Sequence, residues 1–343
     1  LAQPLVFDLY DPLFLEASER QPTPATRYFQ AVFRERLRLM FARGDLFLTS
    51  NDRQKDLYLH LAADLSLPRE ESRFVTVPFG VRGRGEKEPH GWLRQRWPQI
   101  EPGDKIFLWN GGIYPWLDFD TLMHAWARIG MDRADLKLVF LGTGHPGGDR
   151  EICALERQAK QQAQELGLLG RLVFFNDEWV PYERYPDYVG EADVVVCTHR
   201  QTGESRFALR SRLLDAVANG VPILCSNGDV VGEMVRERGF GLGVAPESVA
   251  ELVAAACRLA DDREFWQRCR QNLLASRWEF DWGKVTAPLQ AFCRSPQLAA
   301  DKPAYSSYLW LLARVVLKVG AHSVRIRGWR ATFRAMLRKV REA

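Results

Sequence analysis

Short apolar segments alternate with amphipathic segments along almost the whole chain, and this alternation limits the possible folds more than any other feature. Brief apolar runs fit buried strands, and apolar residues at helical spacing fit the helices between them. Such alternation is typical of an α/β fold with a parallel sheet covered by helices. The expected strands are 5–10, 45–50, 73–77, 106–109, 136–141, 172–175, 193–197, 222–225 and 241–244. The expected helices are 26–42, 50–63, 118–129, 150–166, 183–190, 205–218, 228–238, 247–260 and 262–276.

The 343 residues divide most naturally into two domains. Residues 1–82 hold about half of the elements that a doubly wound domain needs, and the chain begins without Met. We therefore expect a fragment whose first domain is incomplete. Residues 83–104 are rich in Gly, Pro and charge, as in a linker, and 105–276 form a complete second domain.

Composition excludes several classes of protein. The chain is 46% apolar and 26% charged, which excludes a disordered protein. Its six Cys residues are scattered without a CxxC pair, so a disulfide framework or a zinc site is disfavoured and a reducing compartment is expected. No apolar run is long enough to span a bilayer, and no signal-peptide pattern opens the chain.

The C-terminal tail, residues 296–343, is strongly basic. Residues 302–343 contain ten Lys or Arg against one acid, Glu342, whereas the rest of the chain carries a net charge of −5. The stretch 325–341 interleaves basic and apolar residues, which predicts an amphipathic helix on an anionic membrane surface. The alternative is a helix packed on the missing part of the first domain. Nucleic acid is not an expected partner, since no reading motif accompanies the charge.

Glycine-containing loops follow three expected strands of the second domain. Gly111 and Gly112 follow one strand, Gly142 and Gly144 the next, and Gly203 lies in a third loop. Ligands of open α/β sheets bind at the carboxyl ends of strands, where glycine lets backbone N–H groups approach a phosphate. No P-loop of the pattern GxxxxGK[ST] is present. The three loops together favour a nucleotide or phosphate ligand.

The segment 198–222 adds charged residues to this edge. A helix starting near Ser205 would leave N–H groups at Phe207 and Ala208 for an anion. Glu204 and Asp215 are eleven residues apart, so they would share one helix face. Arg212 would share that face too, whereas Arg210 would point to the side. Carboxylates suit ribose hydroxyls and Arg suits diphosphate; the alternative is a solvated face with internal ion pairs.

The same segment resembles the donor-binding signature of GT-B glycosyltransferases of family 4, the glycosyl transferases group 1. The likeness lies in Asp193–Cys197, Glu204 and Leu213–Ile223. Residues 77–80 resemble the hinge of that family, 50–54 the last αβ unit of its acceptor domain, and 278–282 its return segment, within a return helix expected at 277–295. The resemblance covers roughly residues 1–295. It implies a GT-B-type fold of two Rossmann-like domains, the first incomplete, followed by the basic helical tail.

The resemblance assigns donor-binding roles to individual residues. Asp215 takes the place of the acid that binds the donor ribose, and Glu204 is the candidate for the donor sugar hydroxyls. The family spaces its two acids eight apart, and that position is Phe207 here. The loop 111–118 lacks the usual basic residues, so Arg210 or Arg212 would supply the charge for the diphosphate. The loop positions carried over are the phosphate loop Gly111 and Gly112, the second loop Gly142 and Gly144, and the base-binding backbone of Trp179 and Val180.

The implied reaction is transfer of a sugar, with retention of configuration, from a nucleotide-diphosphate sugar to an acceptor hydroxyl. The expected acceptor is a glycan or a lipid-linked molecule in cell-surface polysaccharide or glycolipid synthesis, and the expected location is the cytoplasm, peripheral at the inner face of the membrane. No cofactor or metal is expected, and no catalytic residue is identified. The alternatives are a catalytically inert nucleotide-sugar binding subunit and a GT-B nucleotide-sugar epimerase.

Histidine and tryptophan residues near these loops have simpler interpretations. His145 and His199 lie in expected loops, where a single His is usually a solvated surface residue. Trp109, Trp116 and Trp126 fit core or hinge packing better than a platform for a sugar ring.

Overall fold

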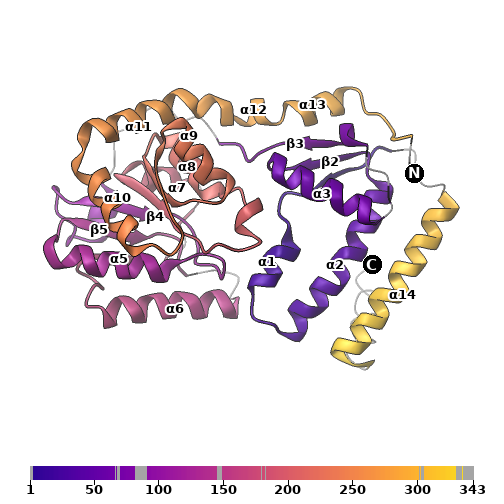
Figure 1. Ribbon diagram of the computed structural model, residues 1–343, viewed down its shortest axis with the longest axis horizontal. Helices are drawn as coiled ribbons and strands as arrows, with labels where there is room; N and C mark the ends of the chain where they lie inside the picture. The colour runs from indigo at the N-terminus through magenta and orange to yellow at the C-terminus, as the bar shows by residue number, and fades with distance from the viewer. Residues whose placement is uncertain are drawn as a thin grey trace. The chain divides into compact units, whose positions relative to one another are not determined.

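The computed structural model describes residues 3–65, 67, 70–81, 91–144, 149–178, 180–181, 183–300, 302, 305–329 and 334. The chain forms two compact units (Figure 1). The first unit combines Leu1–Pro78 with Thr286–Ala343, and the second unit spans Phe79–Val285. The C-terminal part of the chain therefore belongs to the same unit as the N-terminal part.

The first unit contains a parallel three-stranded sheet in the order β1-β2-β3. Buried aromatic rings form its core; Phe47 stacks on Phe74 and meets Phe41 edge-on. Its strands are β1 Val6–Asp8, β2 Leu46–Thr49 and β3 Phe74–Thr76, the last preceded by a 3₁₀ turn, η1 Glu71–Arg73. Its helices are α1 Leu13–Glu19, α2 Pro24–Arg43, α3 Asp52–Asp64, α13 Ala287–Arg294 and α14 Tyr305–Arg327.

Local sequence explains where the helices of this unit begin. Thr23 caps α2 in a reciprocal capping box with Thr26. The Asn51 side chain accepts a hydrogen bond from the Gln54 N–H and caps α3, which confirms the predicted start of that helix. The helix α1 was not predicted, because it is short and lacks a side-chain cap.

The second unit contains a parallel six-stranded sheet in the order β6-β5-β4-β7-β8-β9. Every strand predicted in this part of the chain is confirmed to within two residues. The strands are β4 Lys105–Trp109, β5 Leu136–Phe140, β6 Val173–Phe175, β7 Val194–Cys197, β8 Ile223–Ser226 and β9 Gly241–Val244. The α-helices are α4 Trp92–Arg96, α5 Phe119–Asp132, α6 Arg150–Glu165, α7 Tyr185–Gly190, α8 Ser211–Asn219, α9 Val230–Arg238, α10 Val249–Asp261, α11 Arg263–Ser276 and α12 Trp282–Val285.

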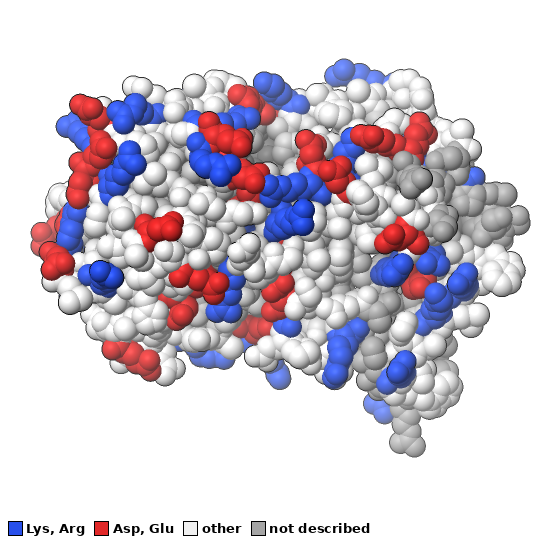
Figure 2. Space-filling view, in the orientation of Figure 1, with Lys and Arg blue, Asp and Glu red and all other residues white. Residues whose placement is uncertain are grey.

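Helices cover both faces of this sheet (Figure 1). The helix α5 packs beside α6 and α10, whereas α8 packs beside α7 and α11. Trp109, Trp116 and Trp126 are buried in the core, as predicted. On the face that Figure 2 shows, acidic and basic side chains of this unit are interspersed.

The strand order places a topological switch between β4 and β7. From β4 the chain proceeds outward to β5 and β6, and it then returns to β7 on the other side of β4. In a doubly wound sheet the ligand crevice lies at the carboxyl ends of the strands beside this switch. The glycine loop after β4 and the segment 198–210 after β7 both leave the sheet there.

The predicted helix 205–218 is wrong at its start. Residues Ser205–Phe207 form a short 3₁₀ turn, η2, and α8 begins only at Ser211. Thr202 and Ser205 exchange hydrogen bonds between their side chains and backbone N–H groups, at 2.9 and 3.2 Å. Such local bonds compete with helix formation. The helix does end at Gly220, in the left-handed conformation, as predicted.

Candidate functional site

The loop after β4 is fixed by the first turn of α8. The Asn110 amide donates to the backbone oxygen of Arg212 at 2.7 Å. In return, the Arg212 guanidinium donates to the backbone oxygen of Gly112 at 3.0 Å, and it lies over the rings of Trp109 and Tyr114, 5.7 Å from each centroid. The loop after β4 and α8 are therefore held together by a cation that packs on aromatic faces.

The glycines of the neighbouring loops allow close backbone packing. A Cβ atom on Gly142 would collide with the backbone of Gly111, which itself has φ +130°. Gly144 has φ +85°, and a Cβ there would lie 2.5 Å from the backbone oxygen of Asp177. Both loops thus require glycine, and they stack the carboxyl ends of β4, β5 and β6 against one another.

The loop after β6 is held by an amide side chain. Asn176 donates to the backbone oxygens of Leu141 at 3.2 Å and Glu178 at 2.6 Å, and its own backbone oxygen accepts from the Thr143 hydroxyl. Val180 follows as a partly buried residue. Trp179 lies outside the described residues, so the base-binding role that was predicted for the backbone of both residues stays a prediction.

Asp215 is the acid of this edge with an unsatisfied carboxylate. It lies on α8 one turn after Arg212 and is half-buried. Within the described part of the chain, its carboxylate accepts no hydrogen bond; only its backbone oxygen accepts one, from Asn219 at 2.8 Å. Burial raises the pKa of the Asp215 carboxyl to about 7, although the charge of Arg212 acts in the opposite direction. Burial also raises the pKa of the Tyr185 phenol, and the charge of Asp215 adds to that rise.

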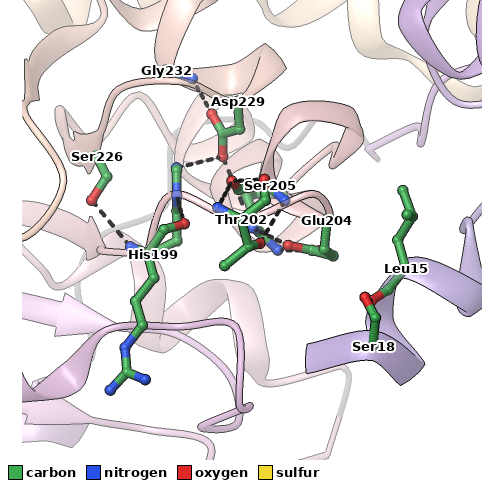
Figure 3. A network of polar contacts seen from close by, with 11 residues as sticks. Leu15, Ser18, His199, Thr202, Glu204, Ser205, Ser226, Asp229 and Gly232 are labelled. Atoms are coloured by element: carbon green, nitrogen blue, oxygen red, sulfur yellow. Dashed lines mark hydrogen bonds and ion pairs between the residues drawn. The ribbon is translucent and has the colours of Figure 1, made fainter. Parts of the chain in front are cut away.

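Glu204 and Arg210 belong to a different, fully buried group. Their side chains form a bidentate ion pair with both N···O distances at 2.7 Å. The Arg210 Nε also lies 3.4 Å from the Asp229 carboxylate, and His199 Nε2 lies 3.4 Å from the same oxygen (Figure 3). The other Asp229 oxygen caps α9 by accepting from the Gly232 N–H at 2.6 Å. These four side chains, Glu204, Arg210, Asp229 and His199, form what we call the buried charge cluster.

This cluster corrects three expectations. His199 is not a solvated surface residue, because only 1% of it is exposed. Glu204 and Asp215 do not share one helix face, since α8 begins between them. The N–H groups of Phe207 and Ala208 are not available to an anion, because they donate to the backbone oxygens of Glu204 and Ser205.

Comparison with known proteins identifies the family. Residues 94–274, just over half of the chain, match the family described as Glycosyl transferases group 1. The chain belongs to this family. The match spans β4 to α11 and thus contains all the loops described above.

Relatives of this group 1 chain are named glycosyltransferases. It is 24% identical over 200 residues to the chitobiosyldiphosphodolichol beta-mannosyltransferase of Candida glabrata, which covers 56% of this chain and 41% of the relative. It is 25% identical over 224 residues to the D-inositol 3-phosphate glycosyltransferase of Nocardia farcinica, 65% of this chain and 45% of the relative. The chain therefore spans less than half the length of either relative.

Solved structures confirm the GT-B glycosyltransferase fold of this group 1 chain. The Anabaena protein HepE in complex with UDP-glucose superposes with a TM-score of 0.63 at 17% identity, over 85% of this chain and 72% of HepE. A UDP-forming alpha,alpha-trehalose-phosphate synthase from Burkholderia vietnamiensis gives 0.65 at 16% identity, over 88% and 68%. At such identities the likeness concerns the fold alone.

The group 1 domain thus brings together one part of the predicted site and separates another. Gly111, Gly112, Gly142, Arg212 and Asp215 lie at one edge of the sheet, on loops and a helix that contact one another. Glu204 and Arg210 form a bidentate ion pair in the interior, so their predicted donor-binding roles compete with a structural one. Phe207 lies on η2, outside α8.

Three residues of this arrangement were not identified from the sequence: Asn110, Asn176 and Asp229. Asp229 had a readable signal, because an Asp directly before an expected helix is a strong N-cap. The two asparagines act on loops far away in sequence, which no local pattern reveals. Among the described residues, no group of three or more His, Cys, Asp or Glu side chains is placed to hold a metal ion.

Proposed function

We propose that this chain carries the donor-binding part of a retaining glycosyltransferase, which moves a sugar from a nucleotide-diphosphate sugar to an acceptor hydroxyl. The observation that carries the proposal is the half-buried carboxylate of Asp215, which lacks a donor among the residues described and lies beside the Arg212 guanidinium. Both residues lie near the carboxyl ends of β4 and β7, beside the topological switch; we call this region the switch edge. An acceptor and a cation one helical turn apart match the ribose hydroxyls and the diphosphate of one ligand.

The ribose end of the donor would bind Asp215. Desolvation disfavours the ionised carboxylate in the free protein. Two ribose hydroxyls would donate to its oxygens and compensate for that cost. The binding of the nucleotide would thus satisfy a group that the fold leaves unsatisfied.

The diphosphate would bind the loop after β4. Arg212 uses one N–H toward Gly112 and has further N–H donors, and its plane is already held by Trp109 and Tyr114. Because Gly111 has no side chain, the Arg212 guanidinium can lie close to this loop; a Cβ there would come within 3.0 Å of it. A fixed cation and fixed backbone dipoles need no reorganisation when charge develops on the leaving group.

In the reaction, the bond between the sugar anomeric carbon and the diphosphate oxygen breaks, and the electron pair leaves with the nucleoside diphosphate. The acceptor oxygen forms the new bond on the same face, and its proton is taken up by the departing diphosphate or by solvent. The chain's own cation, Arg212, would stabilise the departing diphosphate, so the proposal includes no metal and no cofactor. No residue is assigned as the catalytic base.

We further propose that the acceptor is a glycan or a lipid-linked molecule of cell-surface polysaccharide or glycolipid synthesis. The support is the basic composition of residues 302–343, which suits a protein that works in the cytoplasm at the inner face of a membrane. In the described residues, no helix is both long enough and apolar enough to cross a bilayer.

Calorimetry of the chain with UDP, GDP and ADP tests donor binding. We expect one of the three to bind, and Asp215→Ala to weaken that binding by about 1–3 kcal/mol, the cost of a lost charged hydrogen bond. Asp132→Ala is the matched control, since Asp132 is exposed at the far end of α5, where the chain approaches the amino end of β5. Equal affinity in wild type and Asp215→Ala would exclude the ribose role.

Turnover separates the proposed enzyme from its alternatives. Incubation with the matching nucleotide sugar should release free sugar, whose first-formed anomer, observed by NMR, keeps the configuration of the donor. Binding without any release would favour the inert nucleotide-sugar binding subunit. The appearance of an epimeric sugar would favour the epimerase. An inverted anomer would overturn the retaining mechanism while preserving the glycosyltransferase.

A further inference from the structure

The helix α14 packs one face on the first unit and turns the other outward. It lies alongside α2 (Figure 1), with Val315 and Ser323 buried. The Lys318 ammonium forms an ion pair with Glu35 of α2 at 2.9 Å. The helix thus packs on a part of the first unit that is present in the chain. The predicted amphipathic stretch 325–341 lies largely outside the described residues, so its membrane role stays a prediction.

The outward face of α14 is apolar, which is the reverse of an ordinary surface helix. Trp310 is 76% exposed, Leu317 73% and Val316 61%. At 100° per residue these side chains fall on one stripe of the helix. We call this stripe the outer stripe; it consists of Leu309, Trp310, Ala313, Val316, Leu317, Ala321 and Val324.

Cations border the outer stripe on one side. Arg314 and Arg325 are exposed and fall at neighbouring helical angles next to Trp310 and Ala321. The helix contains no acidic residue, and neither arginine has an ion-pair partner in the described part of the chain. In Figure 2, blue side chains outnumber red ones in the region at the lower right, where Figure 1 draws α2 and α14.

We propose that the outer stripe docks on an anionic lipid surface. Its apolar side chains would enter the boundary between headgroups and acyl chains, where an indole such as Trp310 is favoured. Arg314 and Arg325 would bind lipid phosphates beside it. The proposed function supplies only the reason for such docking, since a transferase that acts on a lipid-linked acceptor works at a lipid surface. The docking itself is argued from the outer stripe and its arginines.

Charge argues for lipid over a second copy of this chain. In a symmetric dimer through the outer stripe, each α14 would face another α14. Both helices would then bring Arg314 and Arg325 to the contact without an acid to receive them, and like charges repel there. An anionic headgroup layer supplies the negative charge that a second copy lacks.

Vesicle flotation of the full chain tests the proposal. We expect binding to vesicles of phosphatidylcholine with 30% phosphatidylglycerol, and roughly tenfold weaker binding to pure phosphatidylcholine or at high salt. Trp310→Ser combined with Leu317→Ser should lower binding to anionic vesicles by tenfold or more. Arg314→Gln combined with Arg325→Gln should lower it similarly and remove most of the salt dependence.

The controls separate this proposal from its alternatives. Arg236→Gln combined with Arg268→Gln removes two exposed arginines of the second unit and should leave flotation unchanged. Equal flotation of wild type and the Trp310/Leu317 variant would overturn the proposal. So would a wild-type dimer, seen by light scattering, that the same variant converts to a monomer. Nucleotide calorimetry on each variant shows separately whether donor binding, and with it the proposed function, stands.

Discussion

Two groups of charged side chains arise from one stretch of the second unit and have opposite surroundings. In the buried charge cluster, Glu204 forms a bidentate ion pair with Arg210, and one Asp229 oxygen lies 3.4 Å from both Arg210 Nε and His199 Nε2. At the switch edge, Arg212 rests on aromatic rings and Asp215 lacks a donor within the described residues. Charges that pair with one another in the interior serve the fold, whereas an acid without a donor at an edge is available to a ligand.

Breaking the buried charge cluster should have the largest effect. Arg210→Ala would leave Glu204 and Asp229 buried without a cation, which costs about 3–5 kcal/mol of the free energy of unfolding. Urea denaturation followed by circular dichroism measures it. Arg212→Ala is the matched comparison, and it should cost no more than about 1 kcal/mol, because its guanidinium is half-buried and its ring contacts are partly solvated.

One outcome would show that Arg210 belongs to the ligand site and not to the structural core. If Arg210→Ala unfolds at the wild-type urea concentration and loses nucleotide binding, Arg210 contacts the donor and the cluster is part of the ligand site. The Glu204→Gln/Arg210→Met double variant gives a second measurement. It should recover part of the loss, since replacing both partners removes the uncompensated charge.

At the switch edge, Arg212→Gln should weaken nucleoside diphosphate binding by about 1.5–3 kcal/mol, the range for hydrogen bonds to charged groups. Binding of the nucleoside without phosphates should change little, because Arg212 is assigned to the diphosphate. Arg212→Lys should recover only part of the affinity, as an ammonium lacks the planar fork that packs on Trp109 and Tyr114. A parallel loss for nucleoside and diphosphate, measured by calorimetry, would contradict this assignment.

The sequence predicted the sheet of the second unit well because its strands are short, mostly apolar and closed by turn residues. The glycine loops were predicted for the same reason, since a turn at a strand end is a local property. The buried charge cluster could not be predicted. Pairing of Glu204 with Arg210 depends on η2, and η2 depends on side-chain bonds between Thr202 and Ser205.

The tail shows the same limit. Its charge and apolar residues were visible in the sequence, but the face that packs on α2 was not. Helical spacing alone permits either face to turn inward, and the Lys318–Glu35 ion pair joins residues that are far apart in the chain. Contacts between distant segments decide which face of a helix packs inward, and a single sequence does not reveal those contacts.

The smallest expected effect concerns the protonation of Asp215. Its pKa is about 7 in the folded protein and near 4 when unfolded, so between these values the folded state binds more protons. The Asp215 contribution to stability therefore falls as pH rises from about 4 to about 7, and it stays at its lowest value above that. Asp215→Asn removes this penalty. The variant should match wild type near pH 4 and be more stable by about 1–2 kcal/mol at pH 8, since a half-exposed carboxylate is partly solvated.

Ligand binding should depend on pH in the opposite direction. The ionised carboxylate accepts two ribose hydroxyls, so wild-type affinity for a nucleotide sugar should rise between pH 6 and 8, whereas Asp215→Asn should bind weakly and without this rise. A nucleotide sugar is the right probe, because it lacks the terminal phosphate group that ionises near pH 6. Thermal unfolding and calorimetry over this range give both quantities. Parallel pH profiles of wild type and Asp215→Asn would show that the titrating group lies elsewhere, and the contrast between the paired Glu204 and the unpaired Asp215 would lose its basis.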